Sequence, residues 1–174
     1  MPEDLIKSKA KAYHISLKDE RIECLCYVYA LVFRDIIGML GGEDDDDDDD
    51  DGLLNEASMK KMKISLEIIY NNFYRFKGNG KIKENDPRSS DIDGIIPKLK
   101  FVISRLKAML SIYKYATLDP LQHPEKLSMQ HEASILYEQS LLECRGGMIE
   151  IYALIKWWCR ESPSANCQDL ASAG

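Results

Sequence analysis

The stretch IIPKLKFVISRLKAMLSIYKY, residues 95–115, decides the fold that the sequence predicts. On a helical wheel at about 100° per residue, its apolar side chains fall on one stripe. The stripe consists of Ile95, Leu99, Val102, Ile103, Leu106, Leu110 and Tyr113. We expect an amphipathic helix here, with Pro97 in its first turn and its end near Tyr115 or Ala116, because proline suits the start of a helix.

The same helical period recurs on both sides of this stretch, between turn-forming residues. It predicts four more helices, at about 17–40, 54–76, 125–144 and 148–159. Gly41-Gly42 would end the first of them, and Gly146-Gly147 forms either a turn between the last two or a kink in one long helix. Residues 77–94 hold Gly, Asn, Pro and Ser and are expected to form a connector. The predicted fold is all-α, a compact bundle of about five helices.

The length of 174 residues fits a single domain. The eight adjacent carboxylates of Asp44–Asp51 repel one another and must stay hydrated, so they predict a disordered acidic loop. The chain then divides into four parts. They are a lead and first helix at 1–42, the acidic loop at 43–52, the helical core at 53–161 and a frayed tail at 162–174.

The net charge of -6 conceals a strongly basic middle segment. Residues 43–58 carry ten acidic side chains and no basic one, whereas residues 59–114 carry thirteen basic and five acidic side chains. Within 95–115, Lys98 and Arg105 lie on one edge of the apolar stripe, and Lys100, Lys107 and Lys114 lie on the other edge. Such rows suit a phosphate backbone, since each cation that binds a phosphate releases condensed counterions. The alternative is an ordinary solvated helix face.

No set of residues has the spacing of a catalytic or metal site. The three histidines, His14, His123 and His131, lack the local signature of nucleophilic catalysis, and Cys24-x-Cys26 has no second pair to make a zinc site. The five scattered cysteines predict reduced, mostly buried thiols. The chain also lacks both a long apolar run and a signal-peptide pattern. We therefore expect a cytoplasmic protein that is not an enzyme, with no cofactor, no metal and no membrane contact.

Three segments carry a likeness to a known family. They are Lys60-Lys61-Met62-Lys63, then Ile96-Pro97-Lys98-Leu99-Lys100, and finally Ile149-Glu150-Ile151-Tyr152-Ala153-Leu154-Ile155-Lys156-Trp157-Trp158. In this order the segment from Met59 to Glu161 resembles the small helical subunit of type III CRISPR effector complexes, the Csm type. It departs from that family at Ala108-Met109, where the family has Gly-Arg. Arg105 and Lys107 are the basic residues nearest to that point.

The resemblance implies a non-catalytic subunit of a ribonucleoprotein in antiviral defence, present in repeated copies beside other subunits. It also implies that basic side chains contact the backbone of the guide and target RNA. The candidate RNA-binding residues are Lys60, Lys61, Lys63, Lys98, Lys100, Arg105, Lys107 and Lys114. Four rings near the end of the second long helix would stack on bases or pack in the core; they are those of Tyr70, Phe73, Tyr74 and Phe76. The alternative function is a helical protein-interaction module, such as a host or viral adaptor, whose apolar groove takes a partner helix.

Overall fold

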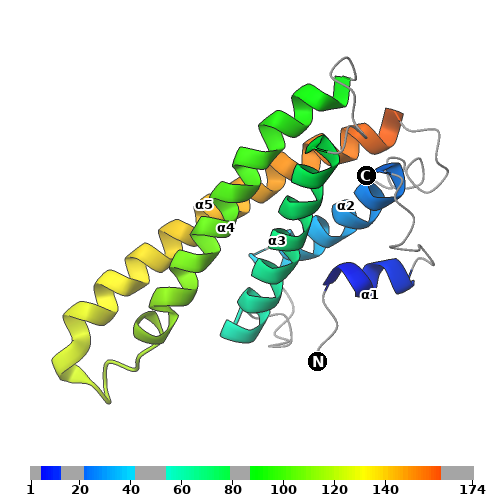
Figure 1. The fold of residues 1–174 in the computed structure, drawn as a ribbon. Helices are drawn as coiled ribbons and strands as arrows, with labels where there is room; N and C mark the ends of the chain where they lie inside the picture. The colour runs from blue at the N-terminus through cyan, green and yellow to red at the C-terminus, as the bar shows by residue number, and fades with distance from the viewer. Residues whose placement is uncertain (1–4, 13–21, 42–53, 79–86, 162–174) are drawn as a thin grey trace.

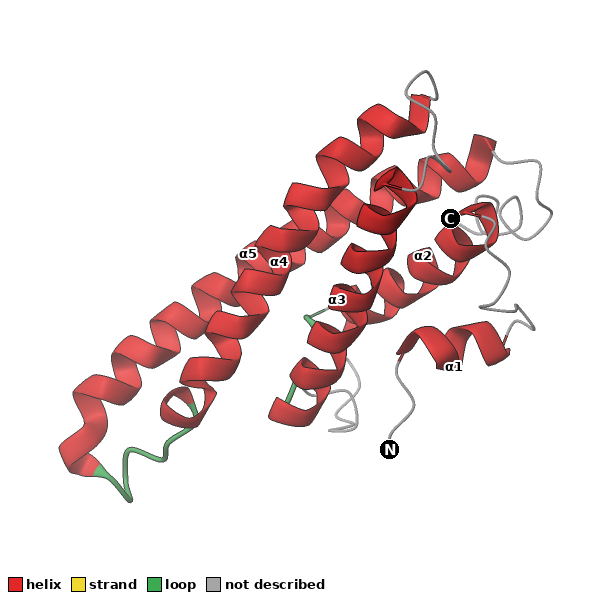
Figure 2. Cartoon of the chain, in the orientation of Figure 1, coloured by secondary structure: helices red, strands yellow, loops and turns green. Residues whose placement is uncertain are grey.

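The computed structural model describes residues 5–12, 22–41, 54–78 and 87–161 (Figure 1). Every regular element within these residues is a helix, which confirms the predicted all-α bundle (Figure 2). The helices are α1 (Leu5–Ala12), α2 (Ile22–Met39), α3 (Glu56–Gly78), α4 (Pro87–Ala116) and α5 (Leu127–Glu161), with a short 3-10 helix at Pro124–Lys126. The acidic run Asp44–Asp51 and the predicted tail lie outside the described residues.

The predicted N-terminal lead contains a helix of its own, α1. Leu5, Ile6 and Ala10 have helical spacing and are buried, so this short helix is held by packing rather than by its length. The Lys9 ammonium also forms an ion pair with Asp35 of α2, at 2.7 Å. The predicted boundaries missed α1 because eight residues give too few turns for a clear period.

Helix α2 is buried around its whole circumference from Leu25 to Phe33. Every residue from Leu25 to Phe33 is buried, which is typical of a helix that is apolar on all sides. It packs mainly against α5, and α1 covers part of it. The predicted stop is confirmed, because α2 ends at Met39 and Gly41 follows with φ of 109°, a conformation that favours glycine.

Helix α4 begins at Pro87, ten residues before the predicted Pro97. The expectation of a connector was therefore wrong for residues 87–94. Ile92 extends the apolar stripe by another turn and is buried, and this packing outweighs the poor helix propensity of Gly94. Pro97 consequently lies inside the helix on its exposed side. The rest of the predicted stripe is confirmed, with Leu110 and Tyr113 at its partly buried margin.

Helix α5 runs without interruption through Gly146-Gly147. The two predicted helices at 125–144 and 148–159 are therefore one helix, and the alternative of a turn between them was wrong. The two glycines differ in their surroundings. A Cβ at Gly147 would lie 2.5 Å from Cγ1 of Val102, whereas a Cβ at Gly146 would meet nothing within 4 Å. Gly147 thus permits the close approach of α4 to α5, and Gly146 faces outward.

Helices α4 and α5 form a long antiparallel hairpin that extends beyond the other helices (Figure 1). Their mutual contact is the most extensive in the molecule, and α3 packs on α4 while α2 packs on α5. The far end of the hairpin is formed by turns and loop at residues 117–123, followed by the 3-10 helix. The arrangement leaves one long outer face on α4 and another on α5.

Candidate nucleic-acid interface

Helix α4 carries three exposed lysines in a line, Lys100, Lys107 and Lys114, which we call the lysine row. Their spacing of seven residues places successive amino groups about 10 Å apart along the helix, given a rise of 1.5 Å per residue. None of the three forms an ion pair with another residue in the described part of the chain. Burial of Leu99, Leu106 and the rest of the stripe fixes the helix that presents them.

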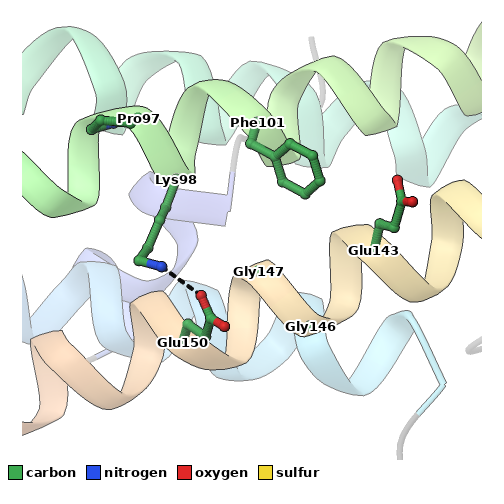
Figure 3. A pocket seen from close by; sticks show the side chains of 7 residues that line it. All are labelled: Pro97, Lys98, Phe101, Glu143, Gly146, Gly147 and Glu150. Carbon is green, nitrogen blue, oxygen red and sulfur yellow. Dashed lines mark hydrogen bonds and ion pairs between the residues drawn. The ribbon is translucent and has the colours of Figure 1, made fainter.

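The basic residues on the other edge of α4 are neutralised by acidic residues of α5. Lys98 pairs with Glu150 at 2.6 Å (Figure 3), and Arg105 pairs with Glu143 at 3.4 Å. The guanidinium of Arg105 also lies 5.5 Å from the centre of the Phe101 ring. These two candidate residues therefore serve the contact between α4 and α5.

On α3, two of the three candidate lysines have acidic partners one helical turn away. Lys60 pairs with Glu56 at 3.0 Å, and Lys63 pairs with Glu67 at 3.7 Å. Such exposed pairs are weak and exchange readily with solvent or another anion. Lys61 is partly buried and has no ion pair with a described residue.

Helix α3 runs antiparallel to α4, and the ion pair of Lys77 with Asp93 sets their register at one end. At the other end, Tyr137 of α5 lies between the two helices: its hydroxyl contacts Sδ of Met59 at 3.8 Å, and its ring packs on Tyr113. Lys63 lies 14 residues before Lys77, and Lys107 lies 14 residues after Asp93. Because the helices are antiparallel, Lys63 and Lys107 are therefore level along the two axes.

The same count places an aromatic pair level with the start of the lysine row. Tyr70 is level with Lys100, and its ring centre lies 6.1 Å from that of Tyr74, which is 63% exposed. Phe73 and Phe76 of the same segment are buried in the core. Of the four rings in this part of α3, Tyr74 is thus the one placed to contact a ligand.

A groove of about 470 Å³ lies between α4 and α5 (Figure 3). The backbone of Gly146 and Gly147 forms one side, and Phe101 forms the other. Charged side chains stand at its margins. We call this feature the glycine groove; its lining residues are Pro97, Lys98, Phe101, Glu143, Gly146, Gly147 and Glu150.

Two cysteines of the described residues are buried, and one histidine lies near a carboxylate. Burial raises the pKa of the Cys144 thiol to about 12, so this buried cysteine stays protonated at neutral pH. Cys26 is also buried, as predicted. At the tip of the hairpin, Nδ1 of His123 lies 3.7 Å from Oε1 of Glu125. In the part of the chain that the structure describes, no three His, Cys, Asp or Glu residues are placed to hold a metal ion.

None of the described helices has the length and apolarity that crossing a membrane requires. Comparisons of the chain with protein-family models, with curated proteins and with solved structures find no match. The interpretation of the site therefore depends on its own geometry and charge.

Proposed function

We propose that the protein is a non-catalytic helical subunit that binds an RNA backbone within a larger ribonucleoprotein, as its resemblance to the small subunit of type III CRISPR effector complexes implies. The observation that carries the proposal is the lysine row. It presents three cations on one rigid helix, without a described acidic partner. Unpaired cations keep their full capacity to replace counterions on a polyanion, whereas paired ones must first lose their partner.

The ligand-binding set is smaller than the sequence predicted. Lys60, Lys98 and Arg105 are paired within the chain, so we assign them a secondary role. The lysine row forms the primary surface, with Lys63 level with Lys107, Tyr70 level with Lys100 and the exposed Tyr74 one helical turn beyond Tyr70. Lys63 belongs here because its pairing with Glu67 is long, at 3.7 Å, and because it lies level with Lys107.

Fluorescence anisotropy with single-stranded RNA at about 50 and 200 mM salt tests the proposal. Replacing Lys100, Lys107 and Lys114 together by alanine should weaken binding without unfolding the chain, because all three side chains are exposed. Each lost phosphate contact lowers the slope of log affinity against log salt by about 0.7 for a single strand, so the slope should fall by about 2.

The matched control replaces Lys60, Lys77 and Lys98 by alanine. It removes the same charge, but each of these lysines has an acidic partner within the chain. The control should change the salt slope far less than the lysine-row variant does. Equal slopes for the two variants would show that net charge alone attracts RNA, and would contradict a specific surface.

A protein-interaction module remains the second candidate function. The glycine groove and the exposed apolar side chains of α5, including Leu142 and Ile149, favour it. These features lie on the α5 side of the hairpin, away from the edge that carries the lysine row. Absence of RNA binding by the intact chain at low salt would leave this second function as the better account.

A further inference from the structure

The face of α5 that points away from the core carries a line of exposed apolar side chains. Ile135, Leu142 and Ile149 are 54%, 67% and 43% exposed. Their spacing of seven residues is about two helical turns, so they lie along one seam, as in helices that pair with other helices. Single exposed leucines are ordinary, but three large apolar side chains repeated along one side of a helix indicate a contact surface.

One edge of this seam combines an exposed apolar side chain with two acidic ones. Leu136 is exposed there, and Glu143 and Glu150 follow on the same edge at intervals of seven residues. Those two glutamates line the glycine groove together with Gly146 and Gly147. Gly147 lies against Val102 of α4, so this edge offers the apolar side chain of Leu136 and an acidic rim.

The other edge of the seam carries one acidic and one basic residue, Glu138 and Arg145. Neither forms an ion pair with another described residue. Nε of Arg145 is buried without a hydrogen-bond acceptor among the described atoms. Glu138 and Arg145 are therefore two opposite charges on one edge that can pair with residues of another molecule.

We propose that a second copy of the chain covers this face, with the two α5 helices antiparallel across a two-fold axis. In such a pair the same edges meet, so Glu138 lies opposite Arg145 of the second copy. The same register brings Leu142 beside Leu142 of the second copy. It also brings Ile135 beside Ile149 of the second copy, each pair being within one residue of level.

Self-complementarity favours a second copy over an unrelated partner. A two-fold interface requires that one surface supply both members of every contact. Here one chain supplies both the acid and the base of the charge pair and both sides of the apolar contact, and a single register matches the two to within one residue. The acidic rim of the groove does not oppose this pairing, because Lys98 and Arg105 already neutralise Glu150 and Glu143.

Sedimentation equilibrium of the full chain without RNA tests the proposal. The intact chain should dimerise, and Leu136→Glu and Leu142→Glu should each raise the dimer Kd at least about tenfold by placing a carboxylate in the apolar seam. Leu121→Glu is the control, because Leu121 is 91% exposed at the hairpin tip, outside α5. Circular dichroism verifies that each variant keeps its helix content.

Charge reversal tests the register itself. Glu138→Arg and Arg145→Glu should each weaken the dimer about tenfold, since each places like charges opposite one another twice. The variant with both changes should recover to within about threefold of the original Kd, because the pair is restored in reverse.

Three results would overturn the proposal. They are a monomer at all concentrations up to about 100 μM, a dimer that Leu136→Glu and Leu142→Glu leave intact, and a doubly reversed variant that fails to recover. The assay contains no RNA and alters no residue of the lysine row. Its outcome is therefore separate from that of the RNA-binding proposal.

Discussion

Gly147 is the residue on which the packing of the long hairpin depends most directly. Its missing side chain lets Val102 of α4 approach the backbone of α5, and Cys144 donates its thiol hydrogen to the Val102 carbonyl oxygen at 3.8 Å one turn away. Gly146, its neighbour, faces outward with open space around it. Two adjacent residues of one type thus have different roles, one in helix packing and the other in shaping the surface.

Alanine substitutions at the two glycines should act in opposite directions. Gly147→Ala should lower the free energy of unfolding by about 1–3 kcal/mol, because the new methyl group forces α4 and α5 apart. Gly146→Ala should raise it by about 0.5–1 kcal/mol, the usual gain for replacing an exposed glycine inside a helix. Urea unfolding measures both values. Similar changes for the two variants would contradict the packing described for Val102.

At the scale of a helix, α3 shows how local hydrogen bonds set a boundary. Asn55 precedes the helix, and its side-chain oxygen accepts a hydrogen bond from the Ser58 backbone N–H at 2.8 Å. The Ser58 hydroxyl lies 2.9 Å from the Asn55 backbone N–H, which completes a reciprocal capping box. Met59, the next residue, is buried. The cap therefore holds the turn that presents Lys60, Lys61 and Lys63.

Loss of this cap should destabilise the fold measurably. Asn55→Ala should cost about 1 kcal/mol of unfolding free energy, because an N-terminal backbone N–H loses its acceptor. Asn55→Asp keeps an acceptor at the same place and serves as the control, with little or no loss expected. Thermal unfolding followed by circular dichroism compares the two. Equal stability of the alanine and aspartate variants would mean that the cap does not hold α3.

At the scale of the whole molecule, one apolar core joins all five helices of the described chain. Two titratable groups lie deep within it. Burial raises the pKa of Tyr29 to about 12, although a hydrogen bond from Asn72 at 2.7 Å opposes the shift. Burial raises the pKa of Cys144 to about 12 as well. Both groups remain neutral in the folded protein at pH values where the unfolded chain ionises.

Stability should therefore decline at alkaline pH. The unfolded chain loses the Cys144 proton near pH 9 and the Tyr29 proton near pH 10, whereas the folded chain keeps both until about pH 12. Over the interval where only the unfolded form is ionised, each group lowers the free energy of unfolding by about 1.4 kcal/mol per pH unit. Urea unfolding at pH 8, about 10 and about 11 measures the decline.

Tyr29→Phe isolates one part of this decline. The variant should lose less stability between about pH 10 and 11 than the parent does, because it has no buried phenol to ionise. Tyr74→Phe, at an exposed position, is the control and should follow the parent. A parallel decline in the parent and in Tyr29→Phe would show that burial of Tyr29 does not govern the alkaline response.

The amino-acid sequence by itself determined the helical fold class, the end of α2 at Gly41, the apolar stripe of α4 and the lysine row, because each depends on period and turn chemistry within a few residues. Only the tertiary structure decided which cations are neutralised, because the acidic partners are distant in the sequence. Glu150 lies 52 residues after Lys98, and Glu143 lies 38 residues after Arg105. Tertiary packing likewise decided that α5 continues through Gly147, where backbone flexibility alone left a turn possible. Tertiary packing also decided the early start of α4 and the burial of residues 25–33 of α2 on all sides. In both cases contacts between distant segments outweighed local propensity.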